Sequence, residues 1–524
     1  MSPPTVSPPK KRIYLNFFEN ACTGSHMSPG QWRSPYDRTS GKDRLPYWLN
    51  LARLAEEGKI SFIFFADSYS LFDVYSRSTA PILRAGAHSA GLDPMVLIPA
   101  MASVTKSVGF GVTGSTSYLT PYILARTFSS LDHLTNGRVA WNVVTSWSKA
   151  AATALGADDV VPHDERYAVA HEYMDLVYKF WESSWADDAV VWDAENRVAF
   201  EPSKVKKIEH KGKYLKASAA SQTHPSPQRT PVLFQAGTSK MGRAFGAKHA
   251  EAIYVGGLVP SQTAGSIAQI RADAAAEGRD PQSLKFFVGI TPIIGRTLEE
   301  AQAKYEQARQ DADVVGGLAQ FSGYTGIDLA RFPLDEVFEL KDAPGDDATH
   351  TFLENFNKAT GNTEPWTPRR LGETMALGGF HPAPVGTPEM VADVFEQWIN
   401  EADVDGFNIA YVTSPGTFED VVYLLRPELV KRGLMWEDYD VEGGTLRENL
   451  YGVKGQTRLR DDHYGHKFKW GSGFEGDTIE AFKAEQAVKE SVNGTNGESK
   501  TNDIEVPLTQ GSVVVGKEPV VVKT

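Results

Sequence analysis

The chain has 524 residues, of which 41% are hydrophobic and 23% charged, a balance typical of a globular protein rather than a disordered or fibrous one. Its formal net charge of −13 argues against a nucleic-acid partner, because the phosphate backbone would be repelled over most of the surface. No apolar run reaches the roughly 20 residues that a membrane span needs, and the one cysteine, Cys22, excludes an intrachain disulfide and favours a reducing, cytoplasmic location.

Short apolar runs alternate with helical patterns after a Pro-rich leader over residues 1–12, which we expect to be disordered. The runs are rich in β-branched and aromatic residues and are mostly continuous, as is typical of parallel strands buried on both faces. The predicted strands cover residues 13–18, 62–67, 107–114, 138–146, 231–237, 252–257, 285–293 and 406–412. Eight strands, each followed by a helix, predict an α/β fold of the (β/α)8 TIM-barrel class, with an open doubly wound sheet as the alternative.

Two helices are well defined by their patterns. Residues 45–58 place apolar side chains at helical spacing. Residues 387–402 begin with Thr387, a good N-cap, and Pro388, which suits the first helical position. An apolar stripe follows along the same helix, so we expect it to cover the sheet.

Two long segments interrupt the alternation of strands and helices, near residues 187–230 and 313–385. Insertions of this length are usually functional loops or lids. We therefore expect one barrel domain over residues 13–470 that carries both insertions. Residues 471–524 become rich in Gly, Ser, Asn and Glu, a composition that predicts a flexible C-terminal tail.

Residues 109–114 match the G-x-G-x-x-G pattern of dinucleotide-binding proteins. That pattern is meaningful only where the glycines turn from a strand into a helix and an acidic residue closes the next strand. Here the glycines alternate with Val108, Phe110 and Val112, so they lie within a strand, and Asp132 falls in a helical stretch. The glycines are better explained by the close approach of a neighbour or ligand.

Polar side chains gather where consecutive predicted strands end. Asp67, Thr113, Asn142, Gln235 and Ser239 all lie at or just after such ends. In a barrel these positions share one rim, which is the rim that carries the active site. Ordinary turn chemistry and helix capping are the alternative explanation for each residue taken alone.

Two predicted helix starts could hold an anion. His163 and Tyr167 stand one helical turn apart at the first, where Asp164 is the expected cap, and Ser239 opens the second. Free backbone N–H groups and the helix dipole would favour a phosphate between them. A capped helix with a surface histidine is the alternative.

Other catalytic chemistry has little support. The histidines show no metal-ligand spacing, so no metal site is predicted. No G-x-S-x-G elbow is present. Cys22 and His26 lie close in sequence, which would be weak evidence for a nucleophile pair.

Several long motifs resemble one known family. They are HMSPGQWRSPYD (26–37), FIFFADSY (62–69), residues 116–146, HDERY (163–167), residues 235–255 and YGVKGQ near residue 451. Over roughly residues 13–470 the chain is similar to the family of nitrilotriacetate monooxygenase component A and dibenzothiophene-sulfone monooxygenase, within the bacterial-luciferase-like flavin-dependent monooxygenases. The leader and the tail lie outside the resemblance.

The resemblance implies a luciferase-like barrel that binds FMN and acts as the oxygenase half of a two-component system. A separate NAD(P)H-dependent flavin reductase would supply reduced FMN, and O2 would give a C4a-(hydro)peroxyflavin that oxygenates a small organic substrate. The family's flavin contacts fall on Asp67, Thr113, His163, Tyr167 and Ser239. The first two would lie nearer the ring system and the other three nearer the phosphate.

The same resemblance leads to weaker expectations. Asn142 lies on the same rim and is added to the flavin contacts, and His26 is a candidate general acid or base. Trp141 and Val143 would help to exclude water. A homo-oligomer, dimer or tetramer, is expected. The alternatives are a flavin- or deazaflavin-dependent oxidoreductase that transfers hydride, and a non-enzymatic flavin-binding paralogue. The substrate cannot be read from the sequence.

Overall fold

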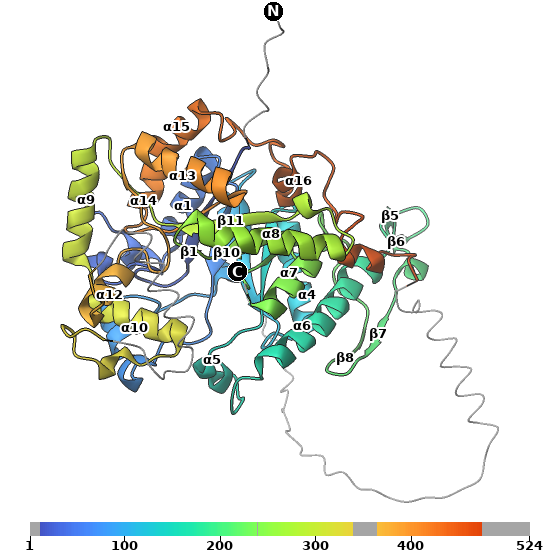
Figure 1. The fold of residues 1–524 in the computed structure, drawn as a ribbon. Helices are drawn as coiled ribbons and strands as arrows, with labels where there is room; N and C mark the ends of the chain where they lie inside the picture. The colour runs from blue at the N-terminus through green and yellow to red at the C-terminus, as the bar shows by residue number, and fades with distance from the viewer. Residues whose placement is uncertain (1–10, 238, 339–363, 474–524) are drawn as a thin grey trace, which may run out of the picture.

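A computed structural model describes residues 11–237, 239–338 and 364–473 (Figure 1). Several sequence predictions fall outside these ranges and are not considered further. They are the first ten residues of the leader, the middle of the second insertion, and all but the first three residues of the predicted tail.

Eight of the described strands form a closed parallel barrel. Each predicted strand is present, so the barrel is confirmed and the open sheet is excluded. Around the barrel the order is β1-β14-β11-β10-β9-β4-β3-β2. The bounds are β1 Tyr14–Asn20, β2 Phe62–Ala66, β3 Gly109–Ser115, β4 Val139–Val144, β9 Val232–Gln235, β10 Ala252–Val255, β11 Lys285–Ile290 and β14 Gly406–Ile409.

Helices follow every barrel strand. Those of the connections are α1 (Leu45–Glu57), α2 (Ala80–Ala85), α3 (Ile98–Ala102), α4 (Pro121–Leu134), α5 (Lys149–Ala154), α6 (His163–Tyr178), α7 (Lys240–His249), α8 (Pro260–Ala276), α9 (Leu298–Asp311), α13 (Pro388–Ala402), α14 (Gly416–Asp420) and α15 (Arg426–Lys431). The two helices with well-defined patterns are confirmed as α1 and α13. Thr387 caps α13 by accepting a hydrogen bond from the Met390 amide, and Val391, Phe395 and Trp398 are buried on its inner face.

Aromatic side chains fill the inside of the barrel. Phe64 stacks on Tyr254 with ring centroids 4.3 Å apart, and Phe62 lies 4.8 Å from Phe234. The amino-end mouth is closed by α16 (Leu446–Tyr451), whose Leu446 and Leu450 belong to the same buried cluster.

The glycines of β3 allow these side chains to approach the strand. A Cβ at Gly109 would lie 2.7 Å from Leu446, one at Gly111 3.0 Å from Phe234, and one at Gly114 2.8 Å from Trp141. All three distances are at or below the limit for real Cβ contacts. Glycine is therefore needed at these strand positions so that neighbouring side chains can pack against the backbone. The glycine pattern does not form a dinucleotide-binding turn.

The two insertions contain secondary structure of their own. Residues 187–230 form two antiparallel hairpins, β5–β6 (Val190–Asp193 and Val198–Phe200) and β7–β8 (Ile208–Lys211 and Lys216–Ala219). The second insertion contributes α10 (Val314–Thr325) and α12 (Pro368–Met375), and its last residues pair as β13 (Val385–Gly386) with β12 (Ile293–Ile294). In Figure 1 the hairpins and the α10–α12 pair lie on opposite sides of the barrel. Helices α10 and α12 touch at Gly317, where a Cβ would lie 2.0 Å from the Gly372 carbonyl oxygen.

Candidate active site

A cavity of about 460 Å³ lies at the carboxyl ends of the barrel strands. Six of the seven residues that the sequence nominated line it, and the seventh, Ser239, is hydrogen-bonded to one of them. The six are His26, Asp67, Thr113, Asn142, His163 and Tyr167. The structure therefore brings all of the nominated residues to one rim of the barrel.

Hydrogen bonds across β2, β3 and β4 fix the inner wall. The Thr113 hydroxyl donates to the Phe65 carbonyl at 3.0 Å, and the Asn142 amide donates to Thr113 Oγ1 at 3.0 Å. Asn142 Oδ1 and Gln235 Oε1 are buried and have no hydrogen-bond partner among the described residues. A buried acceptor without a donor is unfavourable, so these atoms are suited to receive N–H or O–H groups from a ligand.

The two helix starts meet at the mouth of the cavity. His163 Nε2 lies 3.3 Å from Ser239 Oγ, which in turn accepts a hydrogen bond from the Gly242 amide at 3.1 Å. Ser239 therefore caps α7 as predicted. The prediction that Asp164 caps α6 is wrong, because Pro162 is the N-cap residue and Asp164 lies inside the first turn. The Asp164 carboxylate instead contacts His163 Nδ1 at 2.7 Å.

Two glycines form a cradle around the Tyr167 hydroxyl. A Cβ at Gly237 would lie 2.9 Å from this oxygen, and one at Gly242 would lie 2.8 Å from it. Burial raises the pKa of Tyr167, although hydrogen bonds to Ser239, Thr145 and Gln235 oppose that shift. A neutral hydroxyl and free amides at two helix starts are donors that fit a phosphate group.

Asp67 lies just after β2 on the cavity wall. It accepts a hydrogen bond from the Ser68 amide at 2.9 Å, but no helix begins there, so it is not a helix cap. Burial raises the pKa of its carboxyl to about 7, and Asp93 adds to the shift. This carboxyl can therefore hold a proton near neutral pH.

His26 lies at the inner end of the cavity. Its ring is 4.5 Å from Phe18 and 5.0 Å from His88, and its Nδ1 has no described partner. Burial holds the pKa of His26 well below its usual value, so the ring is neutral. A neutral ring with an unpaired nitrogen can accept or donate one hydrogen bond toward a bound molecule.

Two other sequence ideas are not supported. The Cys22 sulfur contacts the carbonyls of Gly24 and Ser25 rather than His26, and burial raises the pKa of its thiol to about 11. The thiol is therefore a poor nucleophile. Trp141 does not line the cavity: it packs outside the barrel against Tyr173 and Trp181. Val143 does line the cavity.

The structure adds residues that the sequence did not nominate. Phe72, His88 and Tyr324 line the inner end of the cavity. His88 sits in a loop with a φ of 47°, and Tyr324 comes from α10 of the second insertion. His381 adds a ring 5.7 Å from Phe18. These residues come from loops and from an insertion, where no strand or helix period marks them.

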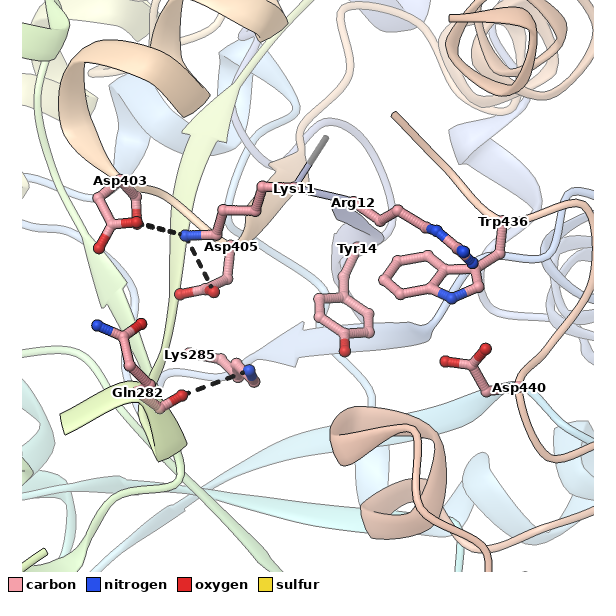
Figure 2. A pocket seen from close by; sticks show the side chains of 9 residues that line it. All are labelled: Lys11, Arg12, Tyr14, Gln282, Lys285, Asp403, Asp405, Trp436 and Asp440. Atoms are coloured by element: carbon pink, nitrogen blue, oxygen red, sulfur yellow. Dashed lines mark hydrogen bonds and ion pairs between the residues drawn. The ribbon is translucent and has the colours of Figure 1, made fainter. Parts of the chain in front are cut away.

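A second groove of about 520 Å³ lies at the opposite end of the barrel, around Tyr14 at the start of β1 (Figure 2). Its charges are largely satisfied by each other. Lys11 Nζ lies 2.7 Å from Asp403 Oδ1 and 3.2 Å from Asp405 Oδ1, and Arg12 sits over the Trp436 ring. Residues at the amino ends of barrel strands serve stability rather than catalysis, so we place the active site at the other rim.

The sequence pattern described as luciferase-like monooxygenase matches residues 23–405. Dimethyl-sulfide monooxygenase from Hyphomicrobium sulfonivorans is 43% identical, over 88% of this chain and 94% of that protein. Nitrilotriacetate monooxygenase component A from Aminobacter aminovorans and dibenzothiophene-sulfone monooxygenase from Rhodococcus erythropolis are 34% and 35% identical, each over 84% of this chain. The matched regions span 96% and 97% of these two proteins, respectively.

Two solved structures are also similar. The crystal structure of DmoA from Hyphomicrobium sulfonivorans superposes with a TM-score of 0.84 at 40% identity, covering 90% of this chain and 98% of that one. Riboflavin lyase, solved with modified FMN and riboflavin, has a TM-score of 0.77 at 35% identity and covers 88% and 100%.

The chain belongs to the luciferase-like monooxygenase family, and the resemblance inferred from its motifs is confirmed. It is a flavin-dependent monooxygenase of the two-component type. Among the described residues no group of His, Cys, Asp or Glu side chains is arranged to hold a metal ion. No helix in the described part of the chain is long and apolar enough to cross a membrane.

Proposed function

We propose that the flavin is FMN and that it binds in the cavity at the carboxyl-end rim. The observation that carries this proposal is the pair of helix starts at the mouth, where His163, Tyr167 and Ser239 present donors within one small region. Asp67, Thr113 and Asn142 lie deeper and would contact the ring system. The unpaired acceptors Asn142 Oδ1 and Gln235 Oε1 suit the N–H and O–H groups of a flavin. A similar structure, riboflavin lyase, contains a modified FMN.

In the proposed reaction the substrate, reduced FMN and O2 give an oxygenated product, oxidised FMN and water. When bound, the reduced flavin supplies both electrons and activates O2. The chain's own residues have three tasks. The helix starts anchor the phosphate, the buried aromatic wall keeps bulk water from the reacting atoms, and His26 exchanges a proton at its unpaired ring nitrogen.

A separate flavin reductase is the proposed partner, since the relatives are oxygenase components of two-component systems. A homo-oligomer remains part of the proposal, as does a cytoplasmic location. The names of the relatives include an uncharged substrate, dimethyl sulfide, and an anionic one, nitrilotriacetate. Sequence similarity alone therefore leaves the substrate class open.

The test is an oxygen-isotope experiment with the full chain. Purified protein is titrated with FMN by fluorescence, then given reduced FMN and heavy-isotope O2 with a panel of organic substrates. We expect saturable FMN binding and a product that carries one labelled oxygen atom. Substrate conversion under anaerobic conditions would instead show hydride transfer, and saturable FMN binding with no conversion of any substrate would favour a non-enzymatic flavin-binding protein.

A further inference from the structure

A second cavity of about 430 Å³ adjoins the inner end of the proposed flavin cavity. The two share a wall made by residues 67–69, Phe72 and His88, together with Asn20. Leu92, Met95 and Leu119 line the far side of the second cavity. Each cavity is within the size range of small-molecule sites, so the pair offers room for a flavin and a separate substrate.

Aromatic rings surround the place where the two cavities meet. Phe72 lies 4.9 Å from the His88 ring and 5.0 Å from Tyr324, while His26 lies 5.0 Å from His88. Such a wall offers apolar contact and few hydrogen bonds. It suits a substrate that has an apolar body.

Among the residues that the structure describes, none that lines this inner end is a lysine or arginine. Among the described residues that line either cavity, Arg166 is the one arginine or lysine. It belongs to the first turns of α6, beside the proposed phosphate position, where its guanidinium also donates to the Val161 carbonyl at 2.6 Å. It is therefore placed to assist the flavin phosphate rather than the substrate.

The nearest buried cation, Lys42, already has a counter-ion. Its Nζ lies 2.6 Å from Glu19 Oε1, with both side chains fully buried, and 2.5 Å from the Tyr411 hydroxyl. An anionic substrate would have to compete with a carboxylate that is held in place by the fold. Lys42 is therefore neutralised by Glu19 and does not provide a counter-ion for a substrate.

The histidines do not supply the missing charge. Gln320 Nε2 lies 3.3 Å from His88 Nε2, so an uncharged amide rather than a carboxylate faces the buried His88 ring. Burial lowers the pKa of His88 to about 3 and that of His381 to about 4. The two carboxyl groups of this region, Asp67 on the shared wall and Asp93 in the second cavity, cannot supply positive charge in either protonation state.

We propose, on the basis of the proposed flavin monooxygenase function, that the substrate is an uncharged, largely apolar molecule held between the two cavities, and that carboxylate-bearing substrates are excluded. A buried carboxylate without a counter-ion is strongly disfavoured. An uncharged thioether, sulfone or hydrocarbon needs no counter-ion. His26 Nδ1, which has no described partner, can make one hydrogen bond to a polar atom of such a substrate.

The test uses matched probes that differ only in charge. Uncharged alkyl methyl sulfides, sulfones and alkanes are compared with analogues that carry a terminal carboxylate or a terminal amine. Binding to the FMN-loaded protein is measured by calorimetry, and turnover with reduced FMN and O2 is measured separately. We expect the uncharged probe to exceed its carboxylate analogue by about 100-fold or more in both measurements.

A variant pair sharpens the result. Leu119→Arg adds a cation to the wall of the second cavity, whereas Leu119→Gln adds polarity without charge. We expect the arginine variant to gain about tenfold in affinity for the carboxylate probe relative to the glutamine variant. Because the probe comparison uses the unmodified chain, a variant that fails to fold leaves that result intact.

Several outcomes would overturn the proposal: comparable binding of carboxylate and uncharged probes, preferential binding of the amines, or no binding of any uncharged probe. Failure of the proposed function looks different. In that case FMN does not bind, or no probe is oxygenated although the uncharged probes bind in preference.

Discussion

The two mouths of the barrel are built from the same eight strands in opposite ways. At the carboxyl ends, buried polar atoms such as His26 Nδ1, Asn142 Oδ1 and Gln235 Oε1 have no described partner, and a cavity lies over them. At the amino ends, α16 fills the opening with Leu446 and Leu450.

The buried charge at the amino ends is well satisfied. Arg447 is fully buried and donates twice to Glu251, at 2.8 and 2.9 Å, and to the carbonyls of Thr457 and Thr230. Unpaired polar groups are costly inside a protein. The unpaired groups that line the carboxyl-end cavity are therefore ones whose missing partners a ligand can supply.

The largest expected effect comes from breaking the amino-end mouth. Arg447→Ala leaves Glu251 buried without its counter-ion and should lower the free energy of unfolding by about 3–5 kcal/mol, measured by urea denaturation. Arg458→Ala is the control, because its ion pair with Asp187 is largely exposed and should contribute about 0–1 kcal/mol. Equal losses for the two variants would contradict this account of the amino-end mouth.

The next effect concerns the carboxyl-end mouth. Replacing His163 by Ala and Tyr167 by Phe should raise the Kd for FMN about 10–100-fold, because hydrogen bonds to a charged group contribute about 1.5–3 kcal/mol. Phe is preferred over Ala at residue 167 because the ring is buried against Phe245.

Tyr173→Phe is the matched control for the flavin-binding variant. Tyr173 lies on the same helix, and its buried hydroxyl has no described partner. Fluorescence titration should show an unchanged Kd for this control. An unchanged Kd in the double variant would contradict the proposal that His163 and Tyr167 bind the FMN phosphate.

Acid should weaken the amino-end side of the molecule. Burial lowers the pKa of His463 to about 3 and that of His249 well below its usual value. Below pH about 6.5 the unfolded chain takes up protons that the folded chain excludes. Stability is therefore lost as the pH falls from about 6.5 toward the folded pKa, by up to about 1.4 kcal/mol per pH unit for each group.

Urea midpoints at a series of pH values measure this loss. His463→Gln cannot take up the proton and should show a shallower decline below pH about 6.5. His133→Gln, at a half-buried position near the end of α4, is the comparison variant and should keep the original slope. If His463→Gln also keeps it, His463 does not contribute to the acid sensitivity.

The smallest effect is the titration of Asp67 in the carboxyl-end mouth. Since the pKa of this carboxyl is raised to about 7, it is neutral below that pH and negative above it. A negative charge in a cavity that binds anionic FMN should reduce FMN affinity as the pH rises through about 7, by less than about tenfold. Asp67→Asn should lose this inflection while keeping the titration of the phosphate itself, and an inflection that persists in the variant would assign it to another group.

Much of the fold could be predicted from the sequence because parallel barrel strands are continuous apolar runs. The nominated rim residues could be predicted because parallel strands bring their carboxyl ends together, and Asp67, Thr113 and Asn142 do line one cavity. The pairing of His163 with Ser239 follows from the same geometry.

The rest depends on tertiary packing. His88 and Tyr324 reach the cavity from a loop and from the second insertion, and neither carries a periodic signal. The cap of α6 was mispredicted because the helix begins two residues earlier than a cap at Asp164 would require. The outward position of Trp141 is an exception, because strand alternation beside the inward-facing Asn142 could have predicted it from the sequence.

The seam between β1 and β14 has a consequence for biosynthesis. Tyr14 pairs with Gly406, so the first strand has no partner on one side until most of the chain has been made. At the usual pace of translation, about 5–20 residues per second, that interval is on the order of a minute. During this time the open sheet exposes an edge that can pair with other chains. Helix α16, which closes the amino-end mouth, is synthesised later still. We therefore expect the newly made polypeptide to be most prone to mispairing until β14 is complete.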